Sequence, residues 1–217
     1  MTRSAEQTTR WVAGNISKMH EVKEAEVISP HTIQITRKKY EPFVAAIISV
    51  PIVTPEILQP LLSADSKIEI VANVPKESLW TGNAIEAIAS QSVAFGGISD
   101  LMSAVSRKNI REYIRREYEF VERGLKQHHR VSELKREFDR VYVVLRPGFP
   151  PLRFVMLNEY ELTADHVRTA KSQYGIFDTV LLNDPNGKPT SSALQVAENM
   201  GIEILKWREF LGRLNRP

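Results

Sequence analysis

The sequence predicts an α/β fold in which a mixed sheet is flanked by helices. Two observations carry this prediction. Continuous apolar runs, such as residues 43–53, and alternating segments, such as "TIQIT", are typical of strands. Helix-capping signals lie between these segments, and from residue 139 onward strands and helices alternate along the chain.

Length and composition set the class of protein. A chain of 217 residues with 42% hydrophobic and 25% charged residues is ordinary for a globular protein of one large domain or of two smaller ones. It contains no cysteine, which excludes disulfides, thiolate nucleophiles and cysteine-based zinc sites. We therefore expect a cytoplasmic protein. The longest apolar run, residues 43–53, contains Pro51 and is too short to cross a bilayer, so we expect no membrane association.

The first half of the sequence predicts an α/β region. A short amphipathic helix is expected within residues 1–20, followed by strands between residues 26 and 53. The sequence Thr54-Pro55-Glu56 is typical of a helix start, "KIEIVANV" predicts another strand, and residues 83–93 predict a helix that ends before Gly96. We assign residues 1–105 to an N-terminal α/β region without a recognisable motif. The sequence shows no internal repeat.

The second half, residues 106–217, predicts a separate domain. Apolar spacing indicates a long helix over residues 106–124, and Ser132 is a candidate cap for a short helix that ends near residue 138. Two strands, "RVYVVLR" and "LRFVMLN", follow as a hairpin. Thr163 and Gly175 then bound a helix, and the chain continues as strand, helix, strand and helix to residue 214.

Two phrases in this half resemble a known family. "ELTADHVRTAKSQYG" resembles the helix after the catalytic strand of the restriction-endonuclease-like, or PD-(D/E)XK, superfamily. "GKPTSSALQVAENMGIEILKWREFLGRL" resembles the closing helix, strand and helix of those enzymes. The resemblance covers residues 106–214, about half of the chain, and implies a restriction-endonuclease-like domain that acts on nucleic acid.

The resemblance also implies where a catalytic site would lie. In the family, an acid at the start of one strand and a Glu-x-Lys pair on the next hold Mg²⁺ and activate water. The corresponding residues here are Asp139, Met156 and Asn158. A thioether and an amide cannot replace a carboxylate and an ammonium group. We therefore expect a catalytically inactive relative without a bound metal.

A different metal site stays open as an alternative. Asp139 together with Glu159 and Glu161 would supply three carboxylates at the end of the strand, and Mg²⁺ would then be the cofactor of a divergent nuclease. The other interpretation is that Glu159 and Glu161 stabilise the first turn of the following helix and face water. Whether the protein is an enzyme is therefore undecided by the sequence.

A basic segment supports nucleic-acid binding. Residues 107–140 contain 11 Lys and Arg against 7 Asp and Glu, although the whole chain carries only +3. Pairs such as Glu119 with Arg123 would neutralise this charge on an ordinary exposed helix. The candidate phosphate-binding residues are Arg111, Arg115, Arg123, Lys126 and Arg130.

Three functions remain in view. The first is a nucleic-acid-binding, catalytically inactive subunit of a DNA-processing or defence assembly, with DNA favoured as the ligand. The second is a Mg²⁺-dependent DNA endonuclease that uses the three carboxylates. The third is a protein-interaction module without a nucleic-acid role. A protein partner or a homo-oligomer is compatible with each.

Overall fold

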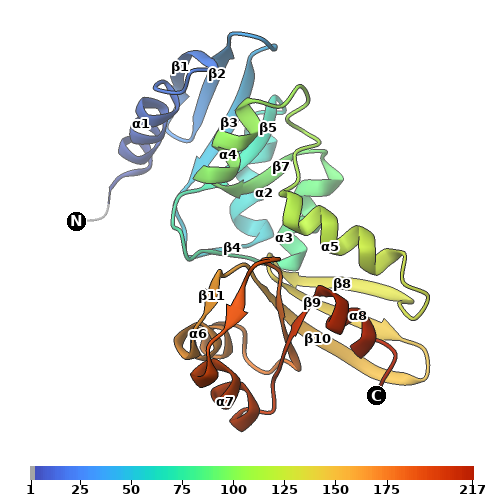
Figure 1. The fold of residues 1–217 in the computed structure, drawn as a ribbon. Helices are drawn as coiled ribbons and strands as arrows, with labels where there is room; N and C mark the ends of the chain where they lie inside the picture. Colours follow the sequence, from blue (N-terminus) through green and yellow to red (C-terminus); the bar gives the residue numbers. More distant parts are fainter. Residues whose placement is uncertain (1–2) are drawn as a thin grey trace. The chain divides into compact units, whose positions relative to one another are not determined.

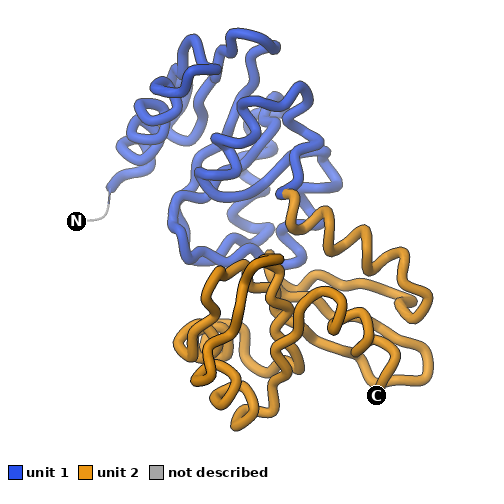
Figure 2. Tube along the Cα trace, viewed as in Figure 1, with its two compact units in different colours: residues 1–115 blue, residues 116–217 orange. Residues whose placement is uncertain are grey.

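The structure, a computed structural model, describes residues 3–217 and contains two compact units. Unit 1 is Met1–Arg115 and unit 2 is Arg116–Pro217 (Figure 2). The boundary therefore falls ten positions after the one expected at residue 105. Each unit contains a mixed five-stranded sheet flanked by helices, so the predicted fold class is confirmed.

Unit 1 is built on a sheet with the strand order β1-β2-β3-β5-β7 (Figure 1). The first three strands are antiparallel neighbours, whereas β3, β5 and β7 are parallel. A small parallel pair, β4 with β6, lies outside this sheet. The elements are α1 (Ala5–Ile16), β1 (Val22–Ser29), β2 (Thr32–Arg37), β3 (Phe43–Ile48), β4 (Ile52–Val53), α2 (Pro55–Ala64), β5 (Ile68–Asn73), β6 (Leu79–Trp80), α3 (Gly82–Ser90), β7 (Ala94–Gly97) and α4 (Ile98–Val105).

Unit 2 has the strand order β8-β9-β10-β12-β14, again with three antiparallel neighbours followed by two parallel strands. A small parallel pair, β11 with β13, is also present. The elements are α5 (Arg116–Lys126), β8 (Glu133–Phe138), β9 (Val141–Arg146), β10 (Phe149–Leu157), β11 (Glu161–Leu162), α6 (Ala164–Tyr174), β12 (Thr179–Leu182), β13 (Lys188–Pro189), α7 (Ser191–Asn199), β14 (Glu203–Lys206) and α8 (Trp207–Arg213).

The two units repeat one another with a constant separation of 109 positions. The Thr81 side chain accepts a hydrogen bond from Ala84 N at the start of α3, and Thr190 accepts the same bond from Ala193 N at the start of α7. The separation also holds for strand register, since β3 pairs Ala45 with Ile70 of β5, and β10 pairs residues 154 and 179. The expectation that the chain contains no internal repeat was therefore wrong at the level of the fold.

Sequence comparison could not detect this repeat, because few side chains are shared. Equivalent residues are different at most positions, and what is conserved is the alternation of buried and exposed side chains. Identical residues at a separation of 109 are Val12/Val121, His20/His129, Val22/Val131, Glu24/Glu133, Arg37/Arg146, Pro42/Pro151, Thr54/Thr163, Ser63/Ser172, Val71/Val180, Thr81/Thr190 and Ala84/Ala193.

Each sheet is covered by helices on both faces. In unit 1, Phe43, Ala45 and Ile47 of β3 contribute to a core with α1 and α4. The intervening residues of β3 contribute to a second core with α2 and α3, because successive side chains of a strand point to opposite faces. In unit 2, Phe154 and Met156 of β10 lie in the core with α5 and α8.

A buried arginine closes the hairpin between the second and third strands of unit 1. Arg37 is 5% exposed, and its guanidinium donates from Nε and Nη2 to the carbonyl of Glu41, at 2.8 and 2.6 Å. Its Nη1 donates to the carbonyls of Val105 and Arg107, at the end of α4. One side chain therefore satisfies carbonyls of the hairpin and of the last helix.

Arg146 does the same in unit 2. Its Nε and Nη2 donate to the carbonyl of Pro150, at 3.2 and 2.7 Å, and its Nη1 donates to the carbonyls of Arg213 and Arg216 after α8. Burial lowers the pKa of both guanidinium groups from the ordinary arginine value. The repeated arginine is therefore part of the structure of each unit rather than of a surface site.

Three parts of the sequence-based assignment were wrong. Residues 106–115 are not helical, because α5 begins only at Arg116. The segment Glu133–Phe138 is the edge strand β8 rather than a helix, and its burial alternates with the period of a strand. The strand β7 and the helix α4 were not predicted. Helix-like charge spacing in the first two segments was overridden by pairing and packing.

Candidate nucleic-acid interface

The positions expected to carry the Glu-x-Lys pair are both occupied in ways that exclude that chemistry. Met156 is fully buried in the core between the sheet and helices α5 and α8. The Asn158 Nδ2 donates to Oε2 of Glu117 on α5, at 3.1 Å. The counterparts in unit 1 are Ile47 and Ser49. Neither unit therefore has a carboxylate and an ammonium group at these positions.

The three carboxylates of the alternative metal site have separate surroundings. Asp139 lies in the turn between β8 and β9, where the Tyr118 hydroxyl donates to its Oδ2 at 3.5 Å and the Arg140 Nε lies 3.8 Å away. Glu159 follows β10 and its Oε2 is 4.0 Å from the His166 Nε2, beside the first turn of α6. Glu161 is exposed on β11. Within residues 3–217 no group of three or more His, Asp or Glu could hold a metal ion, so these acids do not converge.

The five basic candidates do not share one helix, which corrects the expectation of a single basic face. Arg111 and Arg115 belong to unit 1 and lie in the irregular segment before α5. Arg115 contacts buried Asp100, with a distance of 2.9 Å between its Nε and the Asp100 Oδ1. Arg111 donates to backbone carbonyls of unit 1. These two arginines therefore have structural partners.

The other three candidates are exposed in unit 2. Arg123 and Lys126 lie on α5, and Arg130 lies in the following turn with its guanidinium 5.6 Å from the centre of the Phe149 ring. The predicted Glu122–Lys126 ion pair is present at 3.7 Å. The Glu119–Arg123 pair is not, and Arg123 has no ion pair with any residue that the structure describes.

An aromatic pair lies next to Arg123. The rings of Phe120 on α5 and Trp207 on α8 are tilted with their centroids 5.1 Å apart, and Phe120 is 44% exposed. Gly124 permits this contact, because a Cβ there would lie 2.5 Å from the Trp207 Cζ2. Aromatic residues, Arg123 and amphipathic polar groups together line a hollow of about 360 Å³; its residues are Phe120, Arg123, Gly124, Gln127, His128, Trp207 and Leu211. We call this the α5–α8 hollow.

The charges around the α5–α8 hollow favour an anion. Glu122 points away from it toward Arg136 and Tyr142, with its Oε1 3.1 Å from the Arg136 Nη1 and 3.0 Å from the Tyr142 hydroxyl. The negative charge of Glu122 is therefore largely neutralised by Arg136. Burial, and then the nearby charges of His129 and Arg130, lower the pKa of His128 below the ordinary histidine value.

Unit 1 lacks this combination. The counterparts of Phe120 and Trp207 are Trp11 and Ile98, and the counterpart of Arg123 is Gly14. Trp11 is 41% exposed and is covered by the Arg3 guanidinium at 5.2 Å. The sequence analysis found Arg123 and Lys126 from the local basic charge but missed Phe120 and Trp207, because these two residues are 87 positions apart and only the fold brings them together.

Comparison with protein-family models, with curated proteins and with solved structures found no match to this chain. Among the residues described, no helix is both long and apolar enough to cross a lipid bilayer.

Proposed function

We propose that the protein binds nucleic acid through the α5–α8 hollow of unit 2 and does not cleave it. The observation that carries this proposal is the position of Arg123, a cation without an ion pair, beside the exposed Phe120 and its neighbour Trp207. An arginine can contact phosphate while an aromatic ring stacks on a base.

The aromatic pair favours a strand with unstacked bases over a regular duplex. Bases within a duplex already stack on each other, whereas a base in a single strand presents its face to a protein ring. We therefore expect single-stranded DNA to bind more tightly than a duplex of the same length. Residues Lys126 and Arg130 extend the positive charge beyond the hollow and would follow the phosphate backbone.

The absence of cleavage in this proposal is supported by the same unit. Core packing of Met156 and the contact of Asn158 with Glu117 leave the family's Glu-x-Lys chemistry without its side chains. Membership of a restriction-endonuclease-like family and of a DNA-processing or defence assembly stays a prediction from the sequence.

Binding is best tested with a fluorescent single-stranded oligonucleotide and matched charge reversals. The variant Arg123→Glu/Lys126→Glu should weaken binding at least about tenfold, and the dependence of log K on log salt should become shallower by about 0.7 per lost phosphate contact. The control Lys67→Glu/Lys76→Glu makes the same charge change on exposed residues of unit 1. Equal weakening by both variants would show that only net charge matters and would contradict the proposed site.

A second pair of variants separates stacking from charge. Phe120→Ala should weaken single-strand binding by about 1–3 kcal/mol, the usual value of one stacked base. Trp11→Ala, its counterpart in unit 1, should leave binding unchanged. Cleavage of the oligonucleotide in Mg²⁺ that is abolished by Glu159→Ala would support the divergent nuclease instead.

A further inference from the structure

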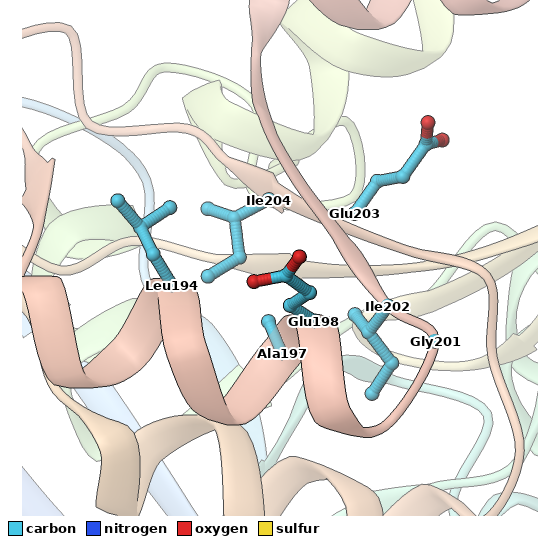
Figure 3. Close-up of a pocket in the computed structure, with 7 residues that line it drawn as sticks. All are labelled: Leu194, Ala197, Glu198, Gly201, Ile202, Glu203 and Ile204. Atoms are coloured by element: carbon cyan, nitrogen blue, oxygen red, sulfur yellow. The ribbon is translucent and has the colours of Figure 1, made fainter.

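Unit 2 contains a second hollow that is filled in unit 1. It lies between α7 and β14, has a volume of about 510 Å³ and is lined by Leu194, Ala197, Glu198, Gly201, Ile202, Glu203 and Ile204 (Figure 3). We call it the α7–β14 hollow. Leu194 is 48% exposed, whereas its counterpart Ile85 is 8% exposed. The same position in the fold is therefore covered in one unit and open in the other.

Larger side chains account for part of the difference. In unit 1, Phe95 of β7 contacts Trp80, with ring centroids 4.9 Å apart. The counterparts in unit 2 are Ile204 and Pro189, which are smaller and do not form such a pair. The loss of two rings leaves apolar surface exposed beside β14, which is an edge strand of its sheet.

A segment of the chain accounts for the rest. After α4, Arg111 donates from Nη1 to the carbonyl of Ser92, at 3.2 Å, and from Nη2 to that of Ser66, at 3.4 Å. Ser92 lies immediately before the strand β7, and Ser66 lies before β5. Arg111 therefore ties an irregular segment to the backbone next to the edge strand.

Farther along, the same segment binds an acid at the start of α4. The Tyr113 hydroxyl donates to the Asp100 Oδ1 at 3.0 Å, and the Arg115 Nε donates to the same oxygen at 2.9 Å. Burial of Asp100 opposes its ionisation, but the hydrogen bond and charge of Arg115 lower its pKa below the ordinary value. The Arg-x-Tyr-x-Arg pattern of residues 111–115 thus spans from the end of α3 to the start of α4.

Unit 2 has the acceptors for such a segment without the segment. The counterparts of Ser92 and Ser66 are Gly201 and Gly175, whose carbonyls accept no hydrogen bond from residues 3–217. The counterpart of Asp100 is Glu209, which caps the Lys206 N at 2.9 Å and has no ion pair within the described part of the chain. Glu198, whose counterpart is Ala89, adds a negative charge at the hollow (Figure 3).

We propose that the α7–β14 hollow, together with Glu209 on α8, is a docking site for an extended basic segment of a partner protein that carries an Arg-x-Tyr-x-Arg pattern. The chemistry of the occupant follows from residues 111–115 of unit 1, which bind the equivalent acceptors there. Charge complementarity supports the same occupant, because Glu198 and Glu209 face it without basic partners of their own. Binding at this edge would also cover the exposed Leu194.

The test uses the full chain and a labelled peptide with the sequence of residues 107–115. Fluorescence anisotropy should show saturable binding. The variant Glu198→Gln/Glu209→Gln, in which glutamine retains the α8 cap, should weaken binding about tenfold through the loss of two charges. Glu77→Gln/Glu86→Gln makes the same change on exposed residues elsewhere and should alter the Kd by no more than about twofold.

A second peptide tests the pattern itself. Replacement of both arginines that correspond to Arg111 and Arg115 by glutamate should abolish binding. No binding of the original peptide, or equal effects of the two protein variants, would overturn the proposal. Sedimentation that shows self-association, lost in Leu194→Glu, would assign this surface to a second copy of the chain and would also overturn it.

Discussion

Unit 1 and unit 2 follow the same path with almost entirely different side chains. Helix, three antiparallel strands, and two further parallel strands with their helices occur in the same order, and no insertion interrupts the separation of 109 positions. The comparison teaches that this fold depends on a pattern of burial, caps and turns rather than on particular residues.

The surfaces of the two units have diverged where the cores have not. Arg123 replaces Gly14 on the first helix, and Ile204 replaces Phe95 on the edge strand. The first change adds a cation without an ion pair, and the second opens a hollow. Both proposed binding sites therefore lie in unit 2, although their scaffold is present twice.

The largest expected effect comes from the shared buried arginine. Arg37→Met or Arg146→Met removes the donor to several buried carbonyls, and each variant should lose about 3 kcal/mol of unfolding free energy. Lys38→Met and Arg208→Met, at exposed positions, are the controls. Denaturant unfolding measures the loss.

Hydrogen exchange then shows where the loss occurs. Protection should fall mainly in residues 3–115 for the first variant and mainly in residues 116–217 for the second. Equal loss of protection throughout the chain in both variants would show that the two units unfold as one cooperative body.

Two helical glycines should respond to alanine with opposite signs. In α5, Gly124→Ala places a methyl group against Trp207 and should cost about 1–3 kcal/mol, despite the better helix propensity of alanine. In α1, the Cβ of Gly14→Ala would have no atom within 4 Å, so this variant should gain about 0.5–1 kcal/mol. Thermal denaturation of the two variants suffices, and a gain at Gly124 would mean that Trp207 moves freely.

A smaller difference is expected at the turn before the last strand of each sheet. Ser92 has φ 53° and its counterpart Gly201 has φ 67°. A left-handed conformation is unfavourable for a residue with a Cβ, so Ser92→Gly should stabilise the protein and Gly201→Ser should destabilise it, each by about 1 kcal/mol. Shifts of the same sign in both variants would contradict this explanation.

The smallest expected effect is a pH dependence specific to unit 2. Because the pKa of His128 is lowered on folding, the unfolded chain takes up the proton more readily than the folded chain. Stability should therefore fall as the pH drops through the ordinary histidine value of about 6.5. The counterpart in unit 1 is Met19, which does not titrate.

His128→Gln should reduce the stability difference between pH 7.5 and pH 5.5, as measured by urea unfolding. An identical difference in the variant and the original protein would show that other groups control this range.

Local sequence signals determined much of the secondary structure. Thr163 and Gly175 bound α6 as predicted, and the apolar runs of β3, β5 and β12 are buried strands. These signals are strong because a cap or a fully apolar run acts over a few neighbouring residues. Charged β8 was assigned as a helix, since its alternation is visible only when it pairs with β9.

The candidate sites required the tertiary structure. Local charge in the sequence was enough to select Arg123 and Lys126, but not to exclude Arg115, whose charge is bound by Asp100. The contact of Phe120 with Trp207 joins distant parts of the sequence and has no local signal.

By itself the sequence determined the α/β class, the helix caps and the lack of the Glu-x-Lys side chains, because each depends on residue type and short-range spacing. Tertiary structure alone decided that the chain is one fold repeated twice and that only unit 2 has two open hollows. The physical reason is that burial constrains the pattern of side chains and leaves their identity free, so that a repeated backbone persists after sequence similarity is lost.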